Sequence, residues 1–302
     1  MVFGSTYRIV YDSDTLRSDS IQRIFKAIYA SLSTYTDSST IMLINNSQTG
    51  GAVDFHLYEI LRTSYRIWKE TNGAFDLTVG PLVNAWGFGF SKKDSVNQQI
   101  IDSLLVGVGM DKIAFSKDSL TKQFGRTQLD VNAIAPGYCG DLISEMFNRN
   151  GIKNYLVDIG GEIRTNGVNP KHDKWRVGID KPIEDPYATN RELQEVIDIS
   201  GKSLATSGNY RKYYYKNGKK YSHTISPKTG YPIENGLLSV SVIASKTIDA
   251  DAYATAFMVM GVDVAYEFVK SRKDLDAYFI YQNEKGELEV RMSSGFKDYI
   301  SN

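Results

Sequence analysis

The chain has 302 residues, of which 42% are hydrophobic, enough to build one large domain or two with a sizeable core. Lysine plus arginine and aspartate plus glutamate number 35 each, so the formal net charge is zero. This balance argues against general nucleic-acid binding and against a polybasic membrane-surface protein, which both need an excess of cations. A single cysteine, Cys139, excludes an intramolecular disulfide and a cysteine-rich zinc site.

No apolar run approaches the roughly 18 residues that a membrane-spanning helix needs, and no signal sequence precedes the globular part. The opening residues Met1–Thr6 lead directly into a strand-like pattern. We therefore expect either a cytoplasmic protein or one whose leader was removed and replaced by an initiator methionine.

The first half of the chain predicts one strand and three helices. Alternation over residues 7–12 is typical of a half-buried strand. Apolar residues recur at helical spacing over residues 18–32, 55–71 and 136–149. Asn72-Gly73 ends the second helix, and Gly151 follows the third in the place of a left-handed cap.

The second half predicts mainly strands, over residues 154–159, 175–179, 193–200, 237–244, 277–282 and 288–291. A helix is expected to begin near Ala250 and a shorter one to cover residues 263–272. Helices and antiparallel-looking strands are mixed without regular alternation, which favours an α+β fold. We expect residues 1–302 to form a single unit, with two intimately packed subdomains as the alternative.

Two segments in the first half carry glycine and acids in unusual density. In residues 71–82, Asp76 lies between two turns, where a loop could bring backbone amides and a carboxylate to a flat polar ligand. The alternative is an ordinary helix cap followed by a type I turn. In residues 130–138, Pro136 stands in the first turn of a helix, whose free amides are a natural phosphate site. Many helices begin this way.

Two segments in the second half add hydroxyls, a histidine and acids. Residues 205–210 are small and hydroxylic, and His223 follows shortly, before a Pro-Lys-Thr-Gly turn. A lone histidine often has only a structural role. Asp251 and Thr255 are four residues apart, so they share one face at the amino end of the predicted helix. Their oxygens suit magnesium, although acids in a first helical turn also complement the helix dipole.

These segments occur together and in an order that resembles the ApbE family, the flavin transferases that move FMN from FAD onto a threonine or serine of an acceptor protein. The resemblance runs from Gly4 to about Gly295. Its motifs are Leu-Ser-Thr-Tyr at 32–35, Gly-Ala-Phe-Asp at 73–76 with Gly-Pro-Leu-Val-Asn at 80–84, Trp-Gly-Phe-Gly at 86–89, Val-Asp-Ile-Gly-Gly-Glu at 157–162, Ala-Thr-Ser-Gly-Asn-Tyr at 205–210, Ser222-His223, and Asp-Ala-Asp at 249–251 through Thr255.

The resemblance implies a T-fold-like arrangement of largely antiparallel sheets packed with helices, and a FAD site in a central cleft. It implies that FAD contacts Phe3, Tyr35, Ala74, Phe75, Asp76, Asp130, Pro136 and Ile225. It also implies that a magnesium ion is held by Asp251, Thr255 and the carbonyls of Ala133 and Ala254, and that His223 is catalytic.

Two positions depart from the family pattern. Pro136 stands where relatives usually carry lysine or another polar residue, so a side-chain contact to FAD is lost there. Ser226 replaces the aspartate of a common His-x-Ile-Asp-Pro motif, which puts in doubt a group that orients the histidine or a second cation.

The implied reaction is phosphoryl transfer in which His223 takes the proton from an acceptor threonine and AMP is released. With water as acceptor, the same site would be a FAD pyrophosphatase. A non-catalytic FAD-binding protein is the alternative from another class, but it need not keep His223, Asp251 and Thr255 together. A redox flavoenzyme is disfavoured because no Gly-x-Gly-x-x-Gly follows a strand. The resemblance further implies an extracytoplasmic, periplasmic protein, membrane-anchored as a lipoprotein whose leader is absent from this chain.

Overall fold

The computed structural model describes residues 3–13, 18–89, 96–183, 192–210, 213–216 and 218–301. Helices α1, α3 and α5 are amphipathic; in α1, for example, Ile21, Phe25, Ile28 and Leu32 form the buried stripe. The α-helices are α1 (Ser18–Leu32), α2 (Thr40–Asn46), α3 (Phe55–Glu70), α4 (Gly80–Ala85), α5 (Gln98–Leu105), α6 (Ala135–Arg149), α7 (Thr247–Met260) and α8 (Val262–Lys270), with 3-10 helices η1 (Met110–Lys112) and η2 (Gly295–Tyr299).

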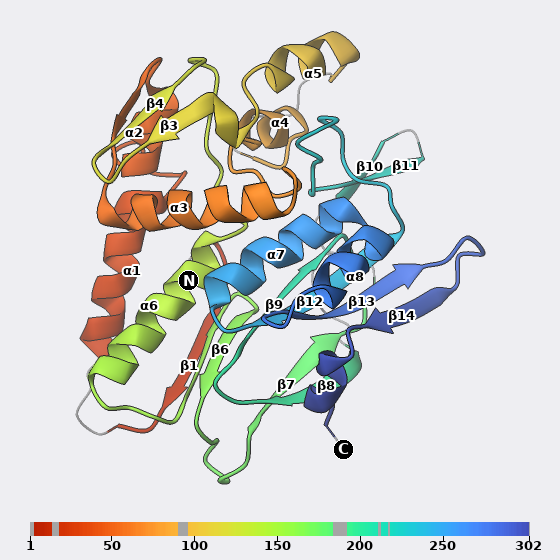
Figure 1. Cartoon of the computed structure of the whole chain (residues 1–302). Coiled ribbons are helices and arrows are strands. Elements are labelled where there is room, and N and C mark those ends of the chain that lie inside the picture. The colour runs from red at the N-terminus through yellow and green to blue at the C-terminus, as the bar shows by residue number, and fades with distance from the viewer. Residues whose placement is uncertain are drawn as a thin grey trace.

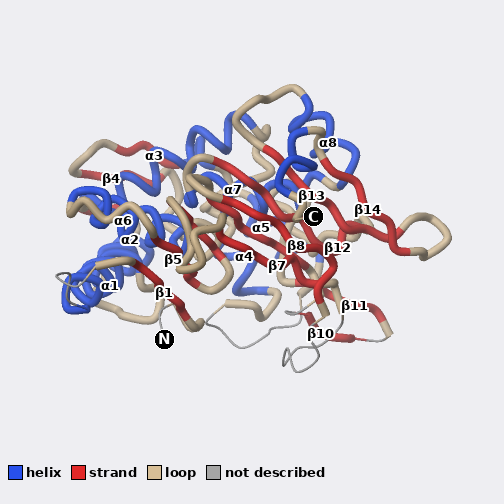
Figure 2. Tube along the Cα trace, turned by 90° about the horizontal axis from the view of Figure 1, so that it is seen from below, coloured by secondary structure: helices blue, strands red, loops and turns tan. Residues whose placement is uncertain are grey.

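A seven-stranded sheet forms the centre, and all of its neighbouring strands pair antiparallel (Figures 1 and 2). This confirms the predicted α+β fold with largely antiparallel sheets. In spatial order its strands are β1 (Tyr7–Tyr11), β5 (Tyr155–Ile159), β6 (Glu162–Asn166), β9 (Ser203–Gly208), β12 (Leu237–Ala244), β13 (Asp276–Gln282) and β14 (Leu288–Met292).

Three smaller sheets surround the central one. The β7–β8 hairpin and η2 cover one face, where Ile243 of β12 packs with Val177 and Phe296. The three-stranded sheet lies beside α2 and α3 (Figure 1). These strands are β7 (Trp175–Asp180), β8 (Leu193–Ile199), β2 (Gly50–Ala52), β4 (Ser119–Lys122), β3 (Ile113–Phe115), β10 (Tyr213–Lys216) and β11 (Lys219–Ser222).

Helices α6 and α7 cover the opposite face of the central sheet, and one hydrophobic core joins them to α1, α2 and α3. Val240 and Val242 of β12 point into this core together with Tyr253 and Phe257 of α7. The division into one unit or two subdomains stays a prediction. Within the described ranges, no helix combines the length and the apolar character that a bilayer crossing demands.

The predicted helix near Ala250 begins three residues earlier than expected, at Thr247. Ten of the 14 residues of α7 are buried, so the helix lacks the one-sided apolar stripe by which an amphipathic helix and its ends are found in sequence. Asp251 and Thr255 do share a face, but in the second and third turns instead of at the amino end. Most of the small, hydroxylic segment 205–210 belongs to β9 inside the central sheet, a strand that the sequence patterns do not predict.

Candidate active site

Helices α6 and α7 approach each other closely because the contact face of α6 carries glycines. A Cβ atom added at Gly137 would lie 2.5 Å from the carbonyl oxygen of Thr247 and 2.8 Å from Cβ of Asp251. At Gly140 the added atom would make ordinary contacts of 3.6 Å or more with the Thr247 side chain. Only a glycine at position 137 therefore permits this packing.

Asp251 of α7 lies at this contact and is 5% exposed. Its Oδ2 accepts a hydrogen bond of 3.0 Å from the Gly137 amide, its sole hydrogen bond in the described part of the chain. Burial raises the pKa of Asp251 to about 7, the Gly137 bond lowers it, and the neighbouring Asp141 adds a further rise. The Asp251 carboxylate has two oxygens and receives one hydrogen bond, so it can still bind a cation.

The start of α6 is built around the same bond. Gly137 is the third residue of α6, where a helix offers its amide no acceptor of its own, and here that amide donates to Asp251. The Ala135 and Tyr138 amides donate to Val131 and Ile134, and Pro136 has no amide hydrogen. The expectation of free amides for a phosphate at this helix start is therefore wrong, since the protein itself uses them.

Asp141 of α6 is a residue that sequence reasoning missed. It is buried, and its two oxygens accept from the Thr247 and Ile248 amides at 2.9 and 3.0 Å, which caps α7 from a neighbouring helix. Burial raises the pKa of Asp141, and the two capping bonds lower it. Asp141 could have been found from the sequence by the spacing of Gly137, Gly140, Asp141 and Ser144. This spacing places small and polar residues along one helical face.

Thr255 lies one turn beyond Asp251, half-buried, with its hydroxyl 3.3 Å from that of Ser207 on β9. Ala254 between them is fully buried. The described residues contain no group of three or more histidine, cysteine, aspartate and glutamate side chains that could hold a metal ion. The implied magnesium ligands differ from such a group because they comprise one carboxylate, one hydroxyl and two carbonyls.

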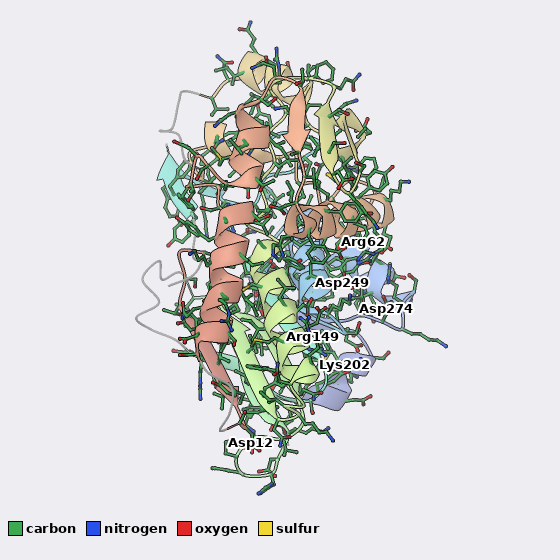
Figure 3. The ribbon with its side chains drawn as sticks, turned by 90° about the vertical axis from the view of Figure 1, so that its left-hand side faces the viewer. Asp12, Arg62, Arg149, Lys202, Asp249 and Asp274 are labelled. Atoms are coloured by element: carbon green, nitrogen blue, oxygen red, sulfur yellow. The ribbon has the colours of Figure 1, made fainter. Side chains whose placement is uncertain are left out.

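The far side of α7 is held by charged and aromatic partners. Asp249 pairs with Arg66 of α3, and Tyr253 donates to Glu70, which also bonds Arg272 at 2.7 Å. Figure 3 labels Asp249 and Asp274 on this side of the molecule. Asp249, although only two residues from Asp251, therefore points to a different set of partners.

The loop with Ala74, Phe75 and Asp76 is buried. Asp76 accepts from the amide and hydroxyl of Thr78 at 2.8 and 2.5 Å and from the Met110 amide at 3.1 Å. Burial raises the pKa of Asp76 to about 6, against the lowering effect of these bonds. Its carboxylate thus fixes the loop.

Phe3 and Tyr35 line one pocket of about 350 Å³ between the first described residues and the end of α1. Asn132 lies in the same pocket, and its amide donates to Asp130 at 2.8 Å. Tyr35 is 74% exposed. The structure therefore places Phe3 and Tyr35 together, next to the segment that contains Asp130 and Ala133.

His223 is half-buried beside an aromatic stack. Its ring lies edge-on to Phe88, 6.4 Å between centroids, and Phe88 stacks on Tyr214 at 5.2 Å. The hydroxyl of the adjacent Ser222 is buried without a partner among the described residues. The Ile225 side chain is buried with Leu82, Trp86 and Ile101, so a contact with FAD there would come from its backbone.

The ApbE family model matches residues 3–279. The chain belongs to the ApbE family. It is 38% identical over 277 residues to the FAD:protein FMN transferase of Escherichia coli K12, covering 89% of this chain and 77% of that protein. The Haemophilus influenzae protein of the same name is 35% identical over 311 residues, covering 97% and 88%.

Solved structures of the ApbE family give the same result. The flavin transferase ApbE from Vibrio cholerae superposes with a TM-score of 0.88 at 30% identity, covering 99% of this chain and 97% of that one. The ApbE fold thus extends over the whole described molecule, including the α6–α7 contact and the strand that precedes His223.

Proposed function

We propose that this protein transfers FMN from FAD to a threonine or serine hydroxyl of an acceptor protein, with magnesium, and releases AMP. The observation that supports it most is Asp251, a buried carboxylate with one hydrogen bond, at the contact between α6 and α7. The ApbE relatives are named FAD:protein FMN transferases, which supports the reaction class.

The residues at this contact fit a magnesium ion. Asp251 and Thr255 offer side-chain oxygens, and Ala133 lies just before the N-cap of α6, outside the helix whose first turn bonds Asp251. We assign the carbonyl of Ala254 as the fourth protein ligand, as the family resemblance implies. These are the hard oxygen ligands that magnesium prefers. A magnesium ion held here supplies charge neutralisation on the FAD pyrophosphate.

FAD is proposed to bind along the segments that converge on this contact. Tyr35 and Phe3 line the pocket that takes one end of the dinucleotide, and the backbone of residues 74–76 and Ile225 contributes polar contacts. Asp130 and Pro136 lie on the segment that leads from the pocket to Asp251. A site with two ends predicts tighter binding of FAD than of riboflavin, which calorimetry can measure.

His223 acts as the general base. It takes the proton of the acceptor hydroxyl while that oxygen attacks the phosphorus on the FMN side of the pyrophosphate. The new phosphoester bond forms as the bond to the AMP phosphate breaks, and AMP leaves with the electron pair. The products are an FMN-protein and AMP.

The direct test is incubation with FAD and magnesium, with and without a candidate acceptor, following AMP release and the acceptor's mass. AMP with a mass increase of one FMN supports transfer, whereas AMP without it supports the alternative FAD pyrophosphatase. FAD binding without AMP in either mixture supports the non-catalytic binder. His223→Ala should keep FAD affinity and lose roughly 100- to 10,000-fold in AMP release, the usual value of general-base catalysis.

An extracytoplasmic location completes the proposal and rests on the family resemblance alone. Fractionation of cells that make the native protein tests it. Recovery with periplasmic markers or with the membrane supports this location, and recovery with cytoplasmic markers contradicts it.

A further inference from the structure

Lys122, at the end of β4, is a buried lysine that lies outside the proposed active site. It is 9% exposed, and its ammonium is surrounded by main-chain oxygens from two parts of the chain. We call these four carbonyls the carbonyl cage: Nζ lies 3.2 Å from Ile44 O, 3.5 Å from Asn45 O, 3.1 Å from Gly125 O and 3.0 Å from Thr127 O.

The carbonyl cage binds the charge without a carboxylate. Burial lowers the pKa of Lys122, and no acid among the described residues counteracts that effect. Ile44 and Asn45 lie in the last turn of α2, so the positive charge also meets the negative end of a helix. A ring of neutral carbonyls around one positive charge is how proteins coordinate potassium, and potassium is close to ammonium in size.

The carbonyl cage is connected to the segment that carries Asp130 and Ala133. Asn45 holds Leu129 from both sides, because its side chain accepts from the Leu129 amide at 2.7 Å and donates to the Leu129 carbonyl at 2.9 Å. The next amide, of Asp130, donates to Leu77 at 2.7 Å, beside the Asp76 loop. The main chain of residues 127–130 therefore connects the carbonyl cage directly to the proposed flavin site.

We propose that the carbonyl cage is a monovalent-cation site filled by the chain's own ammonium, and that Lys122 is a positioning residue for residues 127–133. The positioning role of Lys122 rests on the proposed function, whereas the cation site does not. An open cavity of about 630 Å³, lined in part by Asn45, Gln48 and Gly125, adjoins the cage and gives small cations access to it when the lysine is shortened.

Two substitutions separate the charge of Lys122 from its bulk. Lys122→Ala removes both and leaves room for a cation, whereas Lys122→Met removes the charge and keeps the cage filled. Melting temperatures are measured in potassium, ammonium, sodium and choline chlorides at equal ionic strength. In choline, both variants should melt roughly 5–10 °C below the parent because charged hydrogen bonds are lost. Potassium and ammonium should restore at least half of that loss in Lys122→Ala and none in Lys122→Met.

Lys117→Ala is the matched control, since Lys117 is exposed in the turn between β3 and β4 and should show no cation preference. Equal melting of Lys122→Ala in all four salts overturns the cation site. Failure of Lys122→Ala to refold in any salt overturns it as well, since a functioning cage would recover the fold in potassium.

The positioning role is tested by FAD affinity at a temperature where every variant is fully folded. The dissociation constant of Lys122→Ala should rise about tenfold in choline and return toward the parent's value in potassium, while the parent's value is the same in both. An unchanged FAD dissociation constant in Lys122→Ala overturns the positioning role but does not contradict the cation site. A parent that does not bind FAD contradicts the proposed function, and the melting series still decides the cage.

Discussion

Two buried charges in this protein have opposite surroundings. The Lys122 ammonium faces four carbonyl oxygens, more than its three hydrogens can use. The Asp251 carboxylate receives one hydrogen bond for two oxygens and lies close to a second buried acid, Asp141. A buried charge with a full set of partners is a structural element, whereas one with too few is ready to bind a counter-ion.

The other buried acids support this distinction. Asp141 uses both oxygens to cap α7, and Asp76 receives three hydrogen bonds from Thr78 and Met110. Burial raises the pKa of Asp76 to about 6 and that of Asp251, with fewer bonds, to about 7. Among these acids Asp251 has the fewest donors, which is why we place the cation there.

Replacing Asp251 with asparagine should have the largest effect. The amide oxygen still accepts from Gly137, so the metal-free protein should melt at or above the parent's temperature, because a poorly solvated charge is gone. FMN transfer should fall by at least about 100-fold, since even partners outside the ligand shell are worth 10- to 100-fold. Magnesium titration followed by calorimetry, together with AMP release, measures both.

Asp263→Asn is the matched control, because Asp263 is exposed at the start of α8 and pairs with Arg291 at the surface. It should leave magnesium binding and rate unchanged. A rate in Asp251→Asn that still responds to magnesium would show that the cation binds elsewhere.

The pH dependence of stability should reveal Asp76. Its folded pKa of about 6 exceeds the ordinary 3.8. Between about pH 4 and 6 the folded state therefore keeps a proton that the unfolded chain has already lost. The contribution of this raised pKa to the free energy of unfolding is fully present below about pH 4 and is lost as the pH rises through 6. It amounts to roughly 3 kcal/mol at 1.36 kcal/mol per pKa unit.

Urea unfolding of the parent and of Asp76→Asn at several pH values isolates this term as the difference between the two curves. The parent's free energy of unfolding should fall relative to the variant's between pH 4 and 7. A parent whose free energy of unfolding instead rises relative to the variant's over this pH range would mean that the three hydrogen bonds outweigh the burial of the charge.

Small side chains decide whether the two helices can meet at all. Gly137→Ala places a methyl group 2.5 Å from the Thr247 carbonyl, so α7 must shift, at a cost of about 1–3 kcal/mol. Magnesium affinity should fall with it. Gly140→Ala, one turn further along α6, meets only contacts of 3.6 Å or more and should be neutral or slightly stabilising. Equal melting temperatures for the two variants would contradict the close approach.

Local patterns predicted much of this fold and part of the site. The stripe of α1 and the apolar run of β12 were found because neighbours in sequence suffice to define them. The strand β9 was missed because Ser203–Gly208 is small and polar, and its extended form comes from pairing with β6 and β12.

The site shows the same limit. The four-residue spacing of Asp251 and Thr255 was visible, and family motifs supplied His223 and Tyr35. The cap from Asp141 to Thr247 joins residues 106 positions apart. The carbonyls around Lys122 come from the last turn of α2 and from the segment after β4, and main-chain atoms carry no sequence signature. Contacts made by the backbone across such separations need the fold itself.

The smallest expected effect concerns Ser207, whose hydroxyl lies 3.3 Å from that of Thr255. If Thr255 is a magnesium ligand, Ser207 orients its oxygen from the side of the sheet. Ser207→Ala should then weaken magnesium affinity roughly tenfold, at the low end for groups that support a ligand, with little change in melting temperature.

Thr206→Val is the matched control, because Thr206 precedes Ser207 on β9, points to the opposite face and bonds Ser241 at 2.7 Å. It removes a hydroxyl pair of the same kind but should leave magnesium affinity unchanged. Equal losses of magnesium affinity in both variants would mean that the sheet's stability, and not the orientation of Thr255, sets the affinity.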